Sequence, residues 1–370
     1  EEEEAAAEAG LTPVETAGGE PLYLGVVGRN TVDDQIAIPF LAPERDALLE
    51  YDLVRLIAQL DDPDPPTAAV LTSLPSLSGD GRSPGDSLVL REMARAFRIV
   101  QIERDFLSLP AEADVLVIVH PPPLSDHQLW LADQFLLRKG RALIAVDPAS
   151  RTAVASGRPH ASSGLGALER TLGLRVPTGA VTLDRSLALP VELDVGGGRR
   201  VVEGQPAFIA APRALMSTTD PVTADLSRAV HLGAAGRIER LGEGSSDARF
   251  EPLIRTGDAP ASAPAELAAA GASPREILAA ARPLPGAQTL AGRLSGELAT
   301  AFPDGRPDAD LPADPVLAEQ ARAEIAAAPA RLARSEAAAD VILIADADLF
   351  EDAFYVDPAA GAPVADNAAF

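Results

Sequence analysis

The chain contains no cysteine among its 370 residues. This absence excludes disulfides, thiolate metal sites and cysteine nucleophiles. It fits an oxidising compartment, where a free thiol is a hazard, although many cytosolic proteins also lack cysteine.

Positive charge is scarce as well. Lys139 is the one lysine, and 31 basic against 55 acidic residues give a formal net charge of −24. Nucleic acids bind through clustered lysine and arginine, and anionic lipid headgroups attract the same residues. We therefore expect neither a nucleic acid nor a lipid surface as a partner.

Long apolar runs are also missing. No run reaches the ~18 residues that a bilayer-spanning helix requires, and no signal peptide is present. The sequence starts at Glu1 rather than at methionine and stops at Phe370. We expect both ends to be cut, so that targeting and anchoring segments lie outside this chain.

Aromatic residues make up only 4% of the chain, whereas 47% of its residues are hydrophobic. A core of this size must therefore be built from leucine, valine, isoleucine and alanine. The 33 prolines and 29 glycines predict many turns.

The first 64 residues predict a small unit of their own. We expect residues 1–20 to be a helical stub and linker, and residues 21–64 to form a β-hairpin and a helix. The hairpin strands are predicted at 23–28 and 35–40. The helix is predicted from Pro43, and its buried stripe follows a spacing of three and four residues: Leu49, Leu53, Leu56, Ile57 and Leu60.

Strand and helix patterns alternate in residues 65–257. Buried strands are predicted at 69–74, 99–102, 114–120 and 141–146, and helices at 88–97 and 125–138. Ser125 and Gln128 have the spacing of a capping box, and Gly140 follows the second helix. Such alternation predicts a three-layer α/β fold with a mainly parallel, flavodoxin-like sheet.

The later part of the chain is harder to interpret. We predict a short helix at 165–174, short strands in 176–203 around the turn at Gly196–Gly198, two joined strands in 229–241, and a strand at 251–256. Residues 258–315 are expected to be a mobile insertion (258–286), a strand returning to the sheet (289–300) and a loop. Residues 316–370 should supply a helix and the final sheet strand, at 340–345.

Catalytic signatures are incomplete. Gly81–Gly85 has the letters of a nucleophile elbow, but the residue after Ser83 is Pro84, which has no N–H to donate to an oxyanion. No Walker loop exists, and Gly164-Leu165-Gly166 lacks the third glycine of a dinucleotide fingerprint. We expect no enzyme and no cofactor.

Metal ligands do not form a convincing set either. His120, His127, His160 and His231 give no group of three or four converging ligands. The acidic group Asp346, Asp348, Glu351 and Asp352 could offer oxygen ligands to calcium, but it lacks the spacing and glycine of an EF-hand loop. We interpret it instead as a strand end that leads into a helix N-terminus.

Candidate ligand-binding residues follow from position alone. In open α/β sheets, ligands lie beyond the carboxyl ends of the strands. Those ends are Ser73-Leu74-Pro75, His120-Pro121 and Asp147-Pro148. The predicted site is therefore Ser73, Pro75, His120, Pro121 and Asp147. Alternatively, these prolines only end their strands.

Several segments of this sequence resemble one known family. They are YLGVVGRNTVDDQIAIPFLAPERDALLEYDLVRLI, LTSLP, VLVIVHPPPLSDHQLWLADQFLLRKGRALIAVDP, LGALERTLGL, FEPLIRT, ATAFPDG and IADADLFED. In this order they are similar to the extracytoplasmic part of the GldG-like, gliding-motility-type auxiliary subunits of ABC transport systems.

The resemblance implies a membrane-tethered partner of an ABC transporter, with a transmembrane helix at each end of a large region. Its fold would be similar to a glutamine-amidotransferase module. That chemistry needs a cysteine, so the module here would be non-catalytic. The family has no established catalytic residues to carry over. Residues 1–11 would be the last helix of a missing upstream subdomain, and residues 366–370 would lead towards a missing C-terminal anchor.

The function predicted from these observations is a non-catalytic, substrate-binding-like accessory subunit of an ABC-type system. Its partners would be the permease and ATPase subunits, and its location periplasmic, tethered to the inner membrane. The alternative is a module that binds carbohydrate of the cell envelope, as some relatives are thought to do. A third possibility is an enzyme that uses carboxylates near Asp147 and Asp346.

Overall fold

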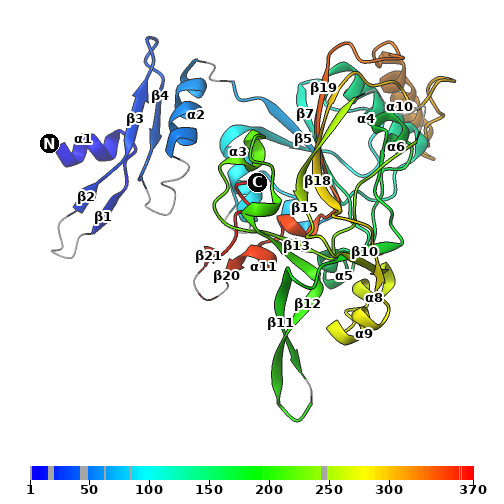
Figure 1. The fold of residues 1–370 in the computed structure, drawn as a ribbon. Coiled ribbons are helices and arrows are strands. Elements are labelled where there is room, and N and C mark those ends of the chain that lie inside the picture. Colours follow the sequence, from blue (N-terminus) through cyan, green and yellow to red (C-terminus); the bar gives the residue numbers. More distant parts are fainter. Residues whose placement is uncertain are drawn as a thin grey trace. The chain divides into compact units, whose positions relative to one another are not determined.

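The computed structural model describes residues 2–370 except 16–20, 42–48, 62–63, 84–85, 195, 243–247, 358 and 360. The chain divides into two compact units, Glu1–Pro66 and Thr67–Phe370 (Figure 1). Within the described parts of the chain, no helix combines the length and the apolar character needed to cross a membrane.

The first unit contains two small antiparallel pairs and two helices. β1 (Pro13–Glu15) pairs with β2 (Pro21–Tyr23), and β3 (Val26–Arg29) pairs with β4 (Gln35–Ile38). The helices are α1 (Glu2–Glu8) and α2 (Leu49–Asp61). The predicted 23–28 strand is therefore divided. The break lies at Gly25, where a Cβ atom would meet the side chain of Leu11 at 2.6 Å.

Helix α2 packs on the β3–β4 hairpin. Leu56 is 5% exposed and lies against Gly28, whose missing side chain leaves room for it. Ile57 is 65% exposed, so its predicted place in the buried stripe is wrong. The predicted start of this helix at Pro43 lies outside the described residues.

A seven-stranded sheet forms the centre of the second unit, in the order β15-β18-β19-β8-β7-β5-β6. The β19-to-β6 part is parallel, and β18 and β15 are added antiparallel beside β19. The parallel strands follow the flavodoxin-like order 2-1-3-4-5 along the chain. The bounds are β5 (Thr67–Thr72), β6 (Arg98–Gln101), β7 (Ala113–Val119), β8 (Arg141–Ala145), β15 (Arg249–Arg255), β18 (Thr289–Gly296) and β19 (Ala339–Ile344).

Both faces of this sheet are buried, as a parallel sheet requires. In β5, Ala69 and Leu71 point into a core shared with α4 (Asp126–Arg138) and α6 (Leu168–Leu172). Val70 points into a second core, shared with α3 (Leu88–Ala96) and α11 (Asp352–Tyr355). The predicted three-layer α/β fold is confirmed.

Helix α4 is fixed at its start and at its middle. Ser125 and Gln128 form the predicted capping box. Asp133 is fully buried and accepts hydrogen bonds from the hydroxyls of Thr171 and Thr300, at 2.6 and 2.7 Å. One carboxylate therefore joins α4, α6 and the segment that follows β18.

A smaller lobe occupies residues 258–286, for which the sequence predicted no regular elements. It contains β16 (Ala261–Pro264), α8 (Ala265–Ala269), α9 (Pro274–Ala279) and β17 (Arg282–Pro283). These elements pack around Ile277, which is 1% exposed, and β16 pairs with β10 (Ala180–Leu183). The segment thus has short regular elements despite its lack of clear periodicity, and its mobility stays a prediction.

Other short strands pair differently from the prediction. β13 (Val230–Gly233) and β14 (Glu239–Arg240) do not form one hairpin: β13 pairs with β12 and β14 with β9 (Leu174–Arg175). β11 (Ala188–Asp194) and β12 (Arg200–Ala211) form the predicted hairpin around Gly196–Gly198. The remaining elements are η2 (Pro75–Leu77), α5 (Arg151–Ala155), η3 (Arg213–Leu215), α7 (Pro221–Ala224), α10 (Pro315–Ala327), η4 (Asp348–Phe350), β20 (Val356–Asp357) and β21 (Ala362–Pro363).

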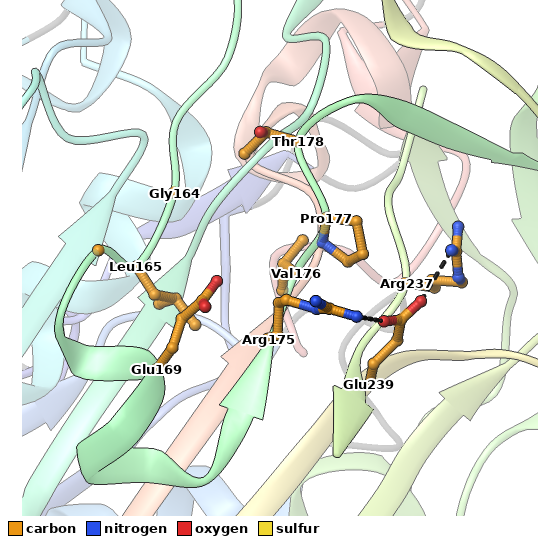
Figure 2. Close-up of a pocket in the computed structure, with 10 residues that line it drawn as sticks. Gly164, Leu165, Glu169, Arg175, Val176, Pro177, Thr178, Arg237 and Glu239 are labelled. Atoms are coloured by element: carbon orange, nitrogen blue, oxygen red, sulfur yellow. Dashed lines mark hydrogen bonds and ion pairs between the residues drawn. The ribbon is translucent and has the colours of Figure 1, made fainter. Parts of the chain in front are cut away.

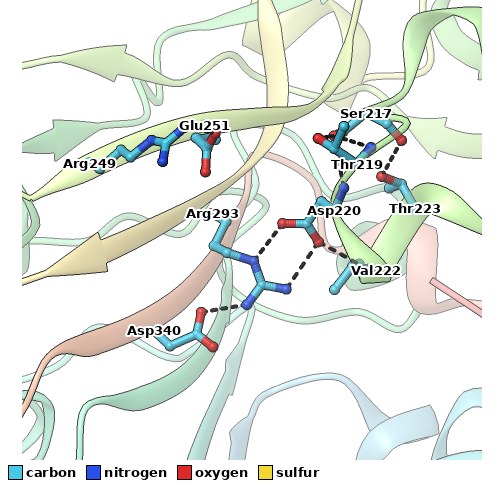
Figure 3. Close-up of polar contacts among 9 residues, drawn as sticks. All are labelled: Ser217, Thr219, Asp220, Val222, Thr223, Arg249, Glu251, Arg293 and Asp340. Carbon is cyan, nitrogen blue, oxygen red and sulfur yellow. Dashed lines mark hydrogen bonds and ion pairs between the residues drawn. The ribbon is translucent and has the colours of Figure 1, made fainter.

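One arginine joins the antiparallel part of the sheet to the outer layer. Figure 3 shows the Arg293 guanidinium between Asp220 and Asp340. It makes two bonds to Asp220, of 2.7 and 3.0 Å, and one of 2.5 Å to Asp340. Asp220 also caps α7 by accepting from the N–H of Val222. The Asp220 side chain is only 10% exposed, so it depends on this partner.

Replacing Arg293 with methionine should lower the free energy of unfolding by about 2 kcal/mol, because the largely buried Asp220 carboxylate loses its charged partner. The control is Arg249→Met on the neighbouring strand β15, where Arg249 is 76% exposed and pairs with Glu251. That change should cost at most about 0.5 kcal/mol. Urea denaturation measures both, and equal losses would contradict the assignment.

Candidate functional site

The predicted site residues gather at the carboxyl edge of the sheet. Ser73 and Pro75 follow β5, His120 and Pro121 follow β7, and Asp147 follows β8. Pro75 is exposed and Ser73 is half-buried, but the other three are buried, and Asp147 has no exposed surface. Side chains that sequence position predicted to contact a ligand therefore lie mostly inside the protein.

His120 takes part in a continuous chain of hydrogen bonds. The Asp147 N–H donates to Ser163 Oγ at 3.0 Å, and Ser163 Oγ lies 3.0 Å from His120 Nδ1. The other ring nitrogen, Nε2, is 3.3 Å from the His160 carbonyl. Burial lowers the pKa of His120, against an opposing effect of the His160 carbonyl. A neutral ring that donates from Nε2 and accepts at Nδ1 satisfies every member of the chain.

The three residue types of a serine-hydrolase triad thus occur together, but with different connections. In a triad, the carboxylate orients the histidine and the other ring nitrogen receives the serine proton. Here Asp147 contributes its backbone N–H, and the second ring nitrogen of His120 is occupied by a carbonyl. Ser163 itself is only 7% exposed. The arrangement supports the loop after β8, and its carboxylate does not orient the histidine as in a triad.

Three carboxyl groups meet beneath this loop. Oxygens of Asp147, Asp346 and Asp348 lie within 4.8 Å of one another, at the ends of β8 and β19. Asp147 accepts from the N–H groups of Ala149 and Ala347, at 2.7 and 3.1 Å. The sequence placed these aspartates at two strand ends; their meeting depends on the pairing of β19 with β8.

Each of the three aspartates has its own set of donors. Asp346 accepts from the N–H of Gly233, at 2.9 Å. Asp348 accepts from Ser150 Oγ and from the N–H of Arg151 at the start of α5, at 2.7 and 2.6 Å.

The electrostatics of this cluster favour bound protons. Burial, followed by the charges of Asp348 and Asp346, holds the pKa of Asp147 well above its usual range. Burial and Asp348 do the same for Asp346, although a hydrogen bond with Asp147 opposes the rise. Burial and the repulsion between neighbouring carboxylates therefore both favour the protonated form in this cluster. Among the described residues, this is the one group of three or more acidic or histidine side chains whose ligand atoms lie close enough together to hold a metal ion.

Glu351 extends the acidic edge towards β5. Its carboxylate accepts a hydrogen bond from Ser76 Oγ, and the residue is 7% exposed. Burial raises the pKa of Glu351 to about 7, with the Ser76 hydrogen bond opposing the rise and the charges of Asp348 and Asp352 adding to it. This group therefore changes its charge near neutral pH.

The other histidines lie apart from this edge. His127 is buried in α4, between the carbonyls of Leu107 and Pro307 and beside the ring of Trp130. His231 bonds to the Phe354 carbonyl at 2.7 Å. These contacts are those of structural side chains.

A cavity of about 480 Å³ opens next to the buried edge, in the loop that follows Ser163 (Figure 2). Gly164 and Gly166 form part of its wall, and Arg175, Arg237 and Glu239 provide an ion-paired group. From the sequence, Gly164 and Gly166 suggest only an incomplete dinucleotide fingerprint. Arg175 and Glu239 meet through the pairing of β9 with β14, and no local sequence pattern predicts this pairing.

A second cavity of similar volume lies beside the start of α4. Its lining includes Asp126, Arg170, Asp304 and Arg306. Both arginines make other contacts. Arg170 donates a hydrogen bond to the Ala301 carbonyl, and the Arg306 guanidinium lies over the Trp130 ring.

Ser163→Ala should lower the free energy of unfolding by about 1–3 kcal/mol, because Asp147 N–H loses its acceptor and His120 Nδ1 its donor. The neighbouring Ser162, which is exposed, provides the control Ser162→Ala, expected to be neutral. Thermal unfolding distinguishes the two variants. Turnover of a nitrophenyl ester that Ser163→Ala abolishes would instead establish a nucleophile.

Glu351→Gln should flatten the pH dependence of stability. A carboxyl whose pKa is higher in the folded state stabilises the protein below the unfolded value of about 4.5, and this stability is lost as pH rises towards about 7. Glutamine keeps an acceptor for Ser76 but binds no proton, so the loss between pH 5 and 8 should shrink by on the order of 2 kcal/mol. Urea denaturation across this range measures it. Glu319→Gln, at a side chain 78% exposed, should leave the slope unchanged.

Comparison with known proteins gives one result. The chain matches the family model described as an ABC-type uncharacterized transport system over residues 65–370. No curated protein and no solved structure matches it. The matched segment includes the whole central sheet and both cavities. The chain therefore belongs to the auxiliary protein family of ABC-type transport systems.

Proposed function

We propose that this protein is a non-catalytic, extracytoplasmic accessory subunit of an ABC-type transport system, of the GldG-like kind, which binds the permease and ATPase of that system. The observation that carries the proposal is the family match, which spans 306 of the 370 residues. The first unit, with its hairpin and helix, lies almost wholly outside that match.

The chemistry of the strand ends supports a non-catalytic role. The polar groups of His120, Ser163 and Asp147 are engaged with one another or with backbone groups. An enzyme needs a nucleophile or base that can reach its substrate. The described strand ends offer buried, hydrogen-bonded side chains in these positions.

The same geometry argues against glycan binding at the strand ends. A glycan-binding site would need polar side chains with free hydrogen-bonding capacity. His120 is 1% exposed, and Asp147 has no exposed surface. Substitution of either residue would lower the stability of the fold, so a loss of glycan binding in such a variant would not identify a binding residue.

The transporter proposal is tested by co-purification. The protein, tagged in its native host and extracted from membranes with a mild detergent, should bring down an ATPase and a permease in stoichiometric amounts. Quantitative mass spectrometry identifies them, and an unrelated tagged membrane protein of equal abundance controls for nonspecific recovery. Recovery of the intact protein without either subunit would overturn the proposal.

A further inference from the structure

The cavity beside Ser163 has two walls of opposite charge. In Figure 2, Glu169 stands on one side, on α6, and Arg175, Glu239 and Arg237 lie on the other. The cavity lies within the second unit. Its lining residues are 164–166, 169, 175–178, 237 and 239, and they include no aromatic ring.

The wall formed by Arg175, Arg237 and Glu239 carries an excess of positive charge. Arg175 donates to one oxygen of Glu239 at 2.5 Å, and Arg237 donates to the other at 2.7 Å. Two guanidinium groups therefore share one carboxylate, which leaves a formal charge of +1. Hydrogen bonds from both arginines lower the pKa of Glu239 against the effect of burial, so it stays ionised.

This positive wall retains unused donors. Only Nη2 of Arg175 has a hydrogen bond to a described residue, and the side chain is 50% exposed. Arg237 Nη1 is buried without a partner among the described residues. A guanidinium with free N–H groups beside a cavity is suited to a carboxylate, which it can bind through two parallel bonds.

The opposite wall carries a negative charge. The Glu169 carboxylate is half-buried and accepts no hydrogen bond from a described residue. Burial raises the pKa of Glu169, and the charges of Arg175 and Arg170 oppose the rise. A cation beside this carboxylate would stabilise its ionised form and so replace the hydration that the group loses on burial.

We propose that this cavity binds a small zwitterion, an amino acid or a short peptide, with its ammonium group at Glu169 and its carboxylate on Arg175. A simple anion would face Glu169, and a simple cation would face the positive wall. A neutral sugar would leave Glu169 without a counter-charge and would find no aromatic ring to stack on. The volume of about 480 Å³ accommodates an amino acid or a dipeptide.

This inference goes beyond membership of a transport system and does not rest on it. It assigns a ligand class to a place in the fold, whichever proteins the subunit contacts. Failure to bind zwitterions would leave the co-purification result unaffected, and the reverse is equally true.

The test uses the purified 370-residue chain, titrated with the common free L-amino acids and with dialanine by calorimetry and NMR. At least one of these probes should bind saturably. Its N-acetylated form, which lacks the ammonium group, and its amidated form, which lacks the carboxylate, should each bind at least ~10-fold more weakly.

Variants assign the two ends of the ligand. Glu169→Gln should weaken binding of the zwitterion ~10-fold, but the weaker affinity for the N-acetylated form should not change. Arg175→Gln should likewise weaken binding of the zwitterion ~10-fold and leave the affinity for the amidated form unchanged. Arg249→Gln, at an exposed arginine on β15, is the matched control and should bind as the original chain does. Circular dichroism confirms that each variant is folded.

Three results would overturn the proposal. One is the absence of saturable binding for every probe up to ~10 mM, a range that includes weak ligands. Another is equal affinity for capped and uncapped forms. The last is unchanged affinity in both Glu169→Gln and Arg175→Gln.

Discussion

The burial of three carboxyl groups at the ends of the two central strands governs this structure. Asp147, Asp346 and Asp348 have no contact with water, so each must be protonated or receive hydrogen bonds from its surroundings. Their donors come from the loop after β8, the start of α5, the end of β13 and the turn after β19. Satisfying these oxygens therefore fixes three separate parts of the chain at once, since the loop after β8 leads directly into α5.

This constraint also determines which polar groups near the strand ends are buried and which are exposed. In many open α/β sheets the strand ends form a crevice. Here Ser163 and His120 close the edge over the aspartates. Exposed polar groups are displaced to the neighbouring walls formed by α6, β9 and β14, where the first cavity lies. The fold thus buries its carboxyl cluster and places exposed ionic groups in the walls of the first cavity, beyond the loop at Ser163.

The sequence predicts the central α/β pattern well because that pattern is local. The run from Asp114 to His120 is apolar on both faces and becomes β7, and the capping box at Ser125 marks the start of α4. The lobe at 258–286 could not be recognised, because its alanine-rich helices have little periodicity and depend on packing around Ile277. The meeting of Arg175 with Glu239, and of Asp147 with Asp346, follows from pairing between distant strands.

The position of β19 has a consequence for synthesis of the protein. This strand lies between β18 and β8 in the middle of the sheet, yet its residues, Ala339–Ile344, are synthesised after those of the other six strands of the sheet. Until they leave the ribosome, β8 has an unpaired edge, and the β15–β18 pair has no neighbour through which to join it. Sheet completion must therefore wait until Ile344 has been synthesised, and a nascent chain held before that point exposes an edge that a chaperone would need to cover.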